Sequence, residues 1–520
     1  MKITGDQLAR LGTVAFLCWA MPAYCQDAKP GSSGSRQAAA SYVPFEGKSS
    51  KWHGFVRYDF VMDDDTLGIA PSEQPQSEGD GIGNPAAGQH RCVVVVPAVP
   101  ARGNPWSWRG CYWDHQPQTE IELLKRGFHI AYISASATLR PGKPWDAWYD
   151  FLTQKHGLSQ KPAFVGMSRG GEFAYTWAVA HPDKVACIYA DNPGGNDDVL
   201  ARLGLLARQD VPLLHVCGSV DPILNKFTLP IEAIYQQFGG RISVMIKEGR
   251  GHHPHSLRDP KPIADFIEQS VSETKREPPA FLAAVSARQY YYSKDNQYTF
   301  FPSEGTYVTC RGPFFTPCYE RYEMTVPDVE AFSKVIVPNT PAPGNPWIFR
   351  ADVPQPNAVD LALLARGCYI VTGAMPFNHD DLVVEQWNRV YQHLVQAGLS
   401  SKPVVEGDGG AAGEVLTWVV SNPDKVSCVY FVNPSLHSST AGARLLDNLA
   451  PLARAGVPLV SVCGDRDPCL DDTRELERRY KAAGGNVQVI IRAGASHFPL
   501  APDDPAPVVA FLVKGANLHP

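Results

Sequence analysis

The sequence predicts an α/β fold that occurs twice in tandem, each copy a mostly parallel sheet with helices on both faces. Short apolar runs of strand length alternate with longer amphipathic stretches, which is the pattern of strands joined by crossover helices. The same series of short motifs begins again in the second half. The length of 520 residues also exceeds what one hydrophobic core usually supports, so two domains are expected.

The elements of the first half are predicted from apolar periodicity and turn residues. Strands are expected at 55–61, 92–97, 128–133, 164–166, 185–190, 212–217 and 242–246, and helices at 120–127, 145–156, 172–181 and 200–207, with a loop at 98–109. Strands that alternate with helices in this way imply mostly parallel pairing and helices on both faces of the sheet.

The second half repeats motifs of the first. Gly-Asn-Pro-Trp with an arginine three residues later occurs at 103–109 and again at 344–350. Further matching pairs are 57–59 with 321–323, 123–127 with 363–367, 181–187 with 422–428, and 216–222 with 462–468. We therefore expect a tandem duplication, with a first domain at 42–276, a linker at 277–286 and a second domain at 287–520. A charged, proline-bearing stretch at 272–279 marks the boundary.

The N-terminal residues are typical of a secretory signal. Two basic residues, Lys2 and Arg10, precede an apolar run at 11–21 that is too short to span a membrane. We expect a signal peptide at 1–25 and a flexible linker at 26–41, and hence export to the periplasm or the extracellular space. A lipid anchor at Cys25 and a buried core helix are the alternatives, and no other segment is apolar enough to span a bilayer.

Composition limits the partners. With 47 Lys and Arg against 53 Asp and Glu, the formal charge of −6 offers no basic stripe, so a nucleic-acid partner is not expected. Nothing indicates a cofactor, and the oligomeric state is not predicted.

Export permits disulfides. Candidate pairs are Cys310 with Cys318 and Cys463 with Cys469, whereas Cys187, Cys217 and their counterparts Cys428 and Cys463 lie in apolar strands and fit a core.

The expected nucleophile is Ser168. An apolar run stops abruptly at Gly166-Met-Ser-Arg-Gly170, and an apolar helical pattern continues from there until Pro182. A strand, a sharp turn and a helix place a serine hydroxyl above a sheet, and small residues on both sides let the backbones pass closely. The alternative is an ordinary serine in a glycine-rich turn.

A serine needs a base, and the base needs a carboxylate to orient it. Asp221 comes after the strand at 212–217, and His252 comes after the strand at 242–246, so both lie at the carboxyl edge of the sheet. Three histidines, at 252, 253 and 255, compete for the role of base. Alignment of the two halves favours His252, because it aligns with His497. His253 aligns with a phenylalanine and is therefore assigned to packing. A metal site made of these three histidines is an alternative that we do not favour.

Ester or amide cleavage also needs donors for a developing oxyanion. The backbone N–H of Arg169 is one candidate, and Trp108, in the loop expected after residue 97, is the other. Trp106, Trp108 and Trp113 either line a substrate cleft or are half-buried under a long loop.

These motifs carry a resemblance to a known family. The stretches at 103–109, 166–171, 182–191 and 251–256 resemble secreted bacterial α/β hydrolases of the esterase and prolyl-oligopeptidase-like kind, which are met near polysaccharide-degrading enzymes. The resemblance covers most of 50–270 and, more faintly, 285–515. It implies an α/β-hydrolase fold for both domains and a serine mechanism, but it does not define the substrate. Asn192-Pro193 departs from the family's Ala-Pro at this point.

The expected function is that of an exported serine hydrolase. We expect a carboxylesterase that acts through an acyl-enzyme on acylated carbohydrate or another small ester. A serine peptidase of the prolyl-oligopeptidase type and a non-catalytic binding scaffold are the alternatives.

The second half is expected to be inactive. It retains an acid and a base at Asp467 and His497, but Gly407-Asp-Gly-Gly-Ala411 stands where the first half has its serine. Either Gly409 or Gly410 matches the nucleophile, so no hydroxyl remains.

Overall fold

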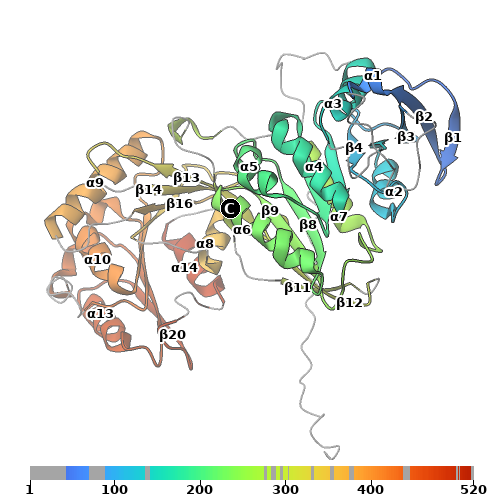
Figure 1. Cartoon of the computed structure of the whole chain (residues 1–520). Coiled ribbons are helices and arrows are strands. Elements are labelled where there is room, and N and C mark those ends of the chain that lie inside the picture. Colours follow the sequence, from blue (N-terminus) through green and yellow to red (C-terminus); the bar gives the residue numbers. More distant parts are fainter. Residues whose placement is uncertain are drawn as a thin grey trace, which may run out of the picture. The chain divides into compact units, whose positions relative to one another are not determined.

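The computed structural model in Figure 1 describes residues 42–69, 88–134, 141–273, 278–282, 289–292, 297–301, 304–329, 333–351, 357–373, 380–436, 446–498, 502 and 504–516. The expected signal peptide and the linker at 26–41 lie outside these residues. Among the described residues, no helix is both long and apolar enough to cross a membrane.

The first sheet confirms the α/β class. Among the described residues it has eleven strands in the order β1-β2-β3-β5-β4-β6-β7-β8-β9-β12-β11. The strands are β1 (Ser49–Trp52), β2 (Phe55–Asp63), β3 (Gln89–Val96), β4 (Trp106–Arg109), β5 (His129–Ile133), β6 (Ala163–Met167), β7 (Cys187–Asp191), β8 (Leu213–Gly218), β9 (Ile242–Lys247), β11 (Gln297–Phe301) and β12 (Thr306–Arg311). The six strands from β5 to β9 along this order pair in parallel, and the strands outside them pair antiparallel.

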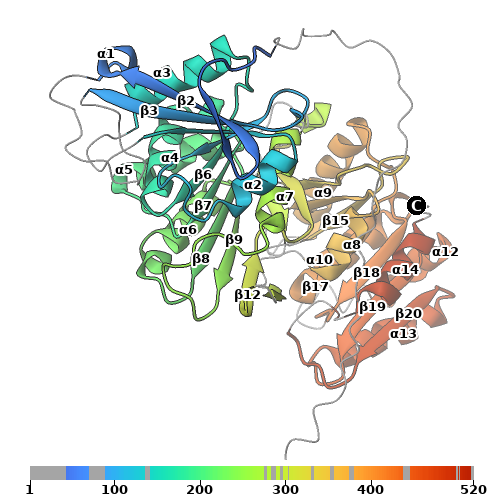
Figure 2. The ribbon, with the colours of Figure 1, turned by 90° about the vertical axis from the view of Figure 1, so that its right-hand side faces the viewer.

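Helices cover both faces of this sheet, because successive side chains of each strand point to opposite faces. In β3, Cys92 and Val94 join one apolar cluster while Val93 and Val95 join another. The first face is covered by α3 (Lys143–Asp150), α4 (Arg169–Ala180), α5 (Asp197–Arg208) and α6 (Leu229–Gln237), and the second by α2 (Gln118–Lys125) and α7 (Lys261–Ser272). Figures 1 and 2 show α4, α5 and α6 on one face, and α2 and α7 on the other.

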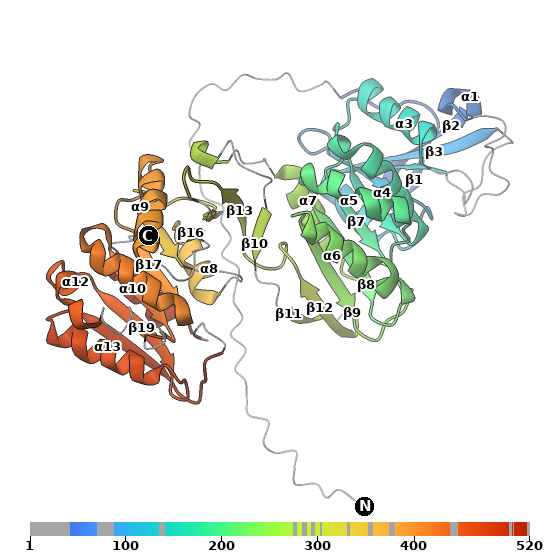
Figure 3. The same cartoon turned by 60° about the vertical axis from the view of Figure 1, so that its left-hand side comes forward.

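The second sheet has the same strand order as the first nine strands of the first sheet. It runs β10-β13-β14-β16-β15-β17-β18-β19-β20. These strands are β10 (Gln289–Tyr292), β13 (Cys318–Met324), β14 (Ser333–Val337), β15 (Trp347–Arg350), β16 (Tyr369–Gly373), β17 (Val404–Asp408), β18 (Cys428–Val432), β19 (Leu459–Gly464) and β20 (Val487–Arg492). Figure 3 shows α9 (Asp380–Gln396), α10 (Ala412–Ser421) and α13 (Leu470–Ala482) on one face, while α8 (Ala358–Leu364) and α14 (Ala506–Gly515) cover the other.

The chain does not pass from the first sheet to the second at a single linker. After β10 in the second sheet, the chain returns to the first, where β12 pairs antiparallel with β9 and β11 with β12. Arg311 on β12 donates two hydrogen bonds to Glu232 on α6, at 2.7 and 2.6 Å. Tyr42–Pro520 form one compact unit. The domain boundary at 277–286 stays a prediction.

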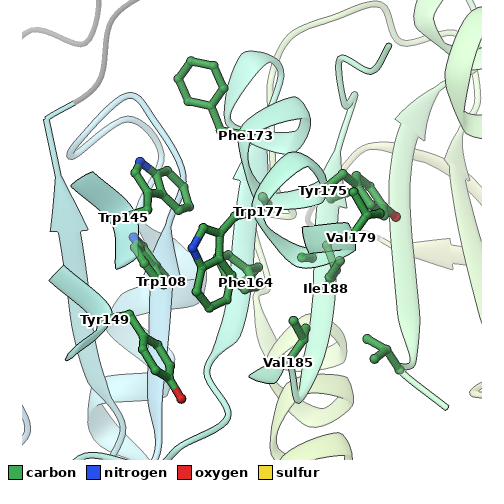
Figure 4. Packing of buried hydrophobic residues seen from close by; sticks show 14 of the residues in the cluster. Trp108, Trp145, Tyr149, Phe164, Phe173, Tyr175, Trp177, Val179, Val185 and Ile188 are labelled. Atoms are coloured by element: carbon green, nitrogen blue, oxygen red, sulfur yellow. The ribbon is translucent and has the colours of Figure 1, made fainter. Parts of the chain in front are cut away.

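The first core is rich in tryptophan, and this overturns the idea of a tryptophan-lined cleft. Trp106 and Trp108 are fully buried, and Trp113 is 8% exposed. Figure 4 shows Trp108 beside Trp145, Phe164 and Trp177, and its ring centroid lies 4.5 Å from that of Trp145. The expected loop at 98–109 also ends in a strand, β4, which these side chains anchor.

The two candidate cysteine pairs are not bonded in this structure, where all ten described cysteines are free. Cys310 lies on β12 of the first sheet and Cys318 on β13 of the second. Cys463 lies on β19 in the core, and Cys469 directly precedes α13. Cys187, Cys217, Cys428 and Cys463 are fully buried, as expected of core residues.

Candidate active site

Ser168 lies at the sharp turn between β6 and α4. Its backbone has φ 50° and ψ −119°, outside the regions that a non-glycine residue normally adopts. Two amides hold this turn, because the N–H groups of Gly171 and Gly194 both donate to the Ser168 carbonyl, at 2.9 and 2.8 Å. The turn therefore aims the hydroxyl away from the strand.

The glycines on both sides of the serine lie too close to neighbouring backbone for any side chain to fit. A Cβ at Gly166 would lie 2.6 Å from the Cα of Gly171, and a Cβ at Gly170 would lie 2.9 Å from the nitrogen of Cys111. Backbone atoms cannot yield as a flexible side chain can. Only glycine therefore fits at these two positions, because the backbones on either side of the turn pass as closely as the motif predicts.

His252 and Asp221 converge on this serine. The Nε2 atom of His252 lies 3.1 Å from the Oγ of Ser168, and its Nδ1 atom lies 2.7 Å from the Oδ2 of Asp221. Asp221 is buried and accepts a second bond on Oδ1 from the N–H of Ile223, at 3.0 Å. The carboxylate thus has a fixed orientation, and the imidazole, one-third exposed, bridges it to the hydroxyl.

Asn192 ties the histidine loop to the sheet, a role that sequence reasoning missed. Its Nδ2 donates to the carbonyl of His252 at 2.9 Å, and its Oδ1 accepts from the N–H of Gly218 at 2.9 Å. Asn433 makes the same two contacts with His497 and Gly464 in the second half. The signal available in the sequence was an Asn-Pro pair directly after the equivalent strand in both halves.

The two candidate oxyanion donors differ in position. Arg169 is the first residue of α4, where helix geometry leaves the backbone N–H without an intrahelical partner. Trp108 lies instead within β4, which pairs with β5 on one side and β6 on the other, and its side chain is in the core. Trp108 is therefore not placed to donate, and the backbone that adjoins the serine turn is that of Gly110 and Cys111.

The other two histidines of the run take separate positions. His255 is buried and its Nδ1 lies 2.8 Å from the Oδ1 of Asp191, which also accepts bonds from the hydroxyl of Tyr189 and the N–H of Ser256. Burial raises the pKa of Asp191, but the charge of Lys247 and the bonds it accepts outweigh this and lower it. His253 is exposed, so its assignment to packing was wrong.

In the second half, Gly409 occupies the position of the serine. Its φ of 50° equals that of Ser168, and a Cβ there would lie 3.6 Å from the Nε2 of His497. The Nδ1 of His497 lies 3.0 Å from the Oδ2 of Asp467. The acid and the base are therefore assembled beside a residue that has no side chain. Of the two glycines that could match the nucleophile of the first half, Gly409 is the one in its position.

The carboxylates before Gly409 point elsewhere. Arg350 donates to Asp408 at 2.7 Å and forms a second ion pair with Asp360. Glu406 is buried in the same cluster, and this burial raises its pKa well above the ordinary value. Asp408 is thus held by an arginine rather than presented to His497.

No family model and no curated protein matches this chain. Several solved structures do. A monoacylglycerol lipase of Paleococcus ferrophilus is 12% identical with a TM-score of 0.28, over 36% of this chain and 100% of that one. Est1E from Butyrivibrio proteoclasticus is 12% identical with a TM-score of 0.31, over 38% and 99%. An alpha-beta serine hydrolase homologue from Coxiella burnetii is 16% identical with a TM-score of 0.29, over 37% and 95%.

Proposed function

We propose that the chain is an exported serine hydrolase that cleaves carboxylic esters through an acyl-enzyme. One observation carries this proposal: a serine on a strained strand-to-helix turn is joined through His252 to the buried carboxylate of Asp221 by contacts of 3.1 and 2.7 Å. This is the arrangement in which an imidazole removes the serine's proton as the hydroxyl attacks. An acyl group on carbohydrate is the substrate that the family resemblance suggests.

The proposed mechanism uses these contacts in order. The Oγ of Ser168 attacks the ester carbonyl carbon, and its proton passes to the Nε2 of His252, while Asp221 stabilises the imidazolium. The N–H of Arg169 donates to the oxyanion. His252 then gives the proton to the departing alkoxide. Water repeats the same steps on the acyl-enzyme and releases the carboxylic acid.

We also propose that the chain arose by tandem duplication and that its second half performs no acyl transfer. The matching strand order and the Gly409 position support this. Export rests on the N-terminal residues. N-terminal sequencing of protein secreted by an expressing host tests it, and a mature chain that still begins at Met1 would contradict it.

A fluorophosphonate probe tests the serine mechanism on the full chain. We expect labelling of one serine, Ser168, and loss of labelling and of ester cleavage by several orders of magnitude in Ser168→Ala and His252→Ala. Ser159→Ala, in a loop of the same domain, and His393→Ala on α9 are matched controls that should keep both.

The substrate class needs a separate comparison. A short acyl ester and a chromogenic peptide, given to the same protein, distinguish an esterase from a peptidase. Preferential cleavage of the peptide would overturn the ester assignment, and no labelling by the probe would favour a binding scaffold.

A further inference from the structure

Three histidines from two distant parts of the chain meet beside the Ser168–His252 pair. His115 comes from the loop after β4, and His253 and His255 come from the loop after β9. One ligand nitrogen from each lies within 4.8 Å of the others. The ring centroids are 5.8 Å apart for His115 and His253, 5.6 Å for His115 and His255, and 4.7 Å for His253 and His255. None of the three has a role in the proposed hydrolysis.

A carboxylate orients the buried member of this cluster. The Nδ1 of His255 contacts Asp191 at 2.8 Å, so it donates its proton there and leaves the lone pair on Nε2. Histidines that bind metals are held in this way, with the second ring nitrogen bonded to a carboxylate. Asp191 itself is fully buried and fixed by Tyr189 and Ser256.

Hydrogen bonds fix the loop after β4 both to its own strand and to the loop after β9. Within the first segment, the Nη2 of Arg109, at the end of β4, donates to the carbonyl of His115 at 2.6 Å. The Oε1 of Gln116 accepts from the N–H of His255, also at 2.6 Å. The backbone that carries these histidines is thus organised before any ligand binds.

The two cations near the cluster, Arg109 and Lys247, have Glu120 and Asp191 to balance them. An imidazole binds a metal ion through the lone pair of an unprotonated ring nitrogen, whereas it binds an anion only when the ring is protonated.

We propose that His115, His253 and His255 form a binding site for one divalent transition-metal ion of the zinc type, with a fourth position open to solvent. A tetrahedral site with zinc–nitrogen distances of about 2.0–2.1 Å needs ligand nitrogens about 3.4 Å apart. The exposed side chains of His115 and His253 close the remaining distance by rotation, while His255 stays in place.

A second cluster, Asp467, Cys469 and His497, is the competing site. Cys469 is buried, and burial raises the pKa of its thiol to about 11, with the charge of Asp467 as the next cause. Asp467 also already accepts bonds from His497 and from the N–H of Cys469. These observations favour the three-histidine site.

Zinc chloride titrated into the full chain, in competition with a zinc-sensitive fluorescent chelator, tests the proposal. We expect one Zn²⁺ per chain and a loss of affinity of about tenfold or more in His115→Ala and in His253→Ala. Both side chains are exposed, so the variants should fold, which circular dichroism checks. Co²⁺ in place of Zn²⁺ should give the visible absorption of a tetrahedral site, and both variants should lose it.

Two control variants locate the ion. His393→Ala on α9 should bind as the parent does. If His497→Ala removes the ion instead, the site is the Asp467 cluster and the proposal is wrong. It is also wrong if the chain binds no Zn²⁺ at micromolar concentration or if both histidine variants bind it unchanged. Because binding is measured directly, none of these outcomes depends on the hydrolase activity.

Discussion

Acid should destabilise this protein through histidines that are buried in the neutral form. His215 on β8 is fully buried with its Nε2 2.6 Å from the hydroxyl of Tyr175, and burial lowers its pKa to about 3, although the charge of Asp191 opposes the shift. Burial also lowers the pKa of His129 to about 4, against a hydrogen bond to the carbonyl of Pro105.

Linkage gives the direction and size of the effect. Between pH 6.5 and about 3, the unfolded chain binds a proton at His215 that the folded chain does not, so stability falls as the pH falls. Below pH 6.5, protonation of His215 stabilises the unfolded state by about 1.4 kcal/mol per pH unit. At pH 5 this amounts to about 2 kcal/mol. His129 contributes a similar amount, since its folded pKa is also below 5.

The assay is chemical denaturation at pH 7.5 and 5, monitored by tryptophan fluorescence. His215→Gln cannot titrate and keeps a partner for Tyr175, so it should lose about 2 kcal/mol less than the parent between these pH values. His393→Gln, half-exposed on α9, should lose as much as the parent. Equal losses in His215→Gln and the parent would refute the reasoning.

Three substitutions test the candidate site. Asp221→Asn should lower kcat by about 10⁴-fold, because an amide does not orient the imidazole as a carboxylate does; a loss below tenfold in a folded variant would contradict its role. Asn192→Ala frees the loop of the base and should lower kcat/KM by about 10²-fold, while Asn433→Ala, with the same contacts in the second half, should not; equal effects would argue against a positioning role. Gly409→Ser in a Ser168→Ala background should restore slow fluorophosphonate labelling, and a folded variant that stays unlabelled would show that more than the hydroxyl is missing.

Local patterns predicted seven strands of the first sheet, β2, β3 and β5 to β9, and the three residues now found together. Ser168, Asp221 and His252 each come directly after an apolar strand of a parallel sheet, and the carboxyl ends of such strands lie at one edge. The four-residue strand β4 was predicted to be a loop, because its first residue, Trp106, comes directly after the turn residues Gly-Asn-Pro. Apolar periodicity is hard to detect in so short an element.

Contacts across long stretches of sequence could not be predicted from local patterns. His115 and His253 are 138 positions apart, and no local pattern links them; only the fold brings their loops together. The return of β12 to β9 was missed for the same reason, since Cys310 and Cys318 are close in sequence but belong to different sheets. Sequence proximity is therefore weak evidence for a disulfide.

The return of β11 and β12 to the first sheet also affects which fragments of this chain can be expressed separately. A fragment that stops near residue 276 would leave β9 as a bare edge, with its backbone amides and carbonyls open to pairing with another molecule. The complementary fragment would carry the missing hairpin with no sheet to receive it. When the two fragments are mixed or co-expressed, pairing of β12 with β9 should bring them back together.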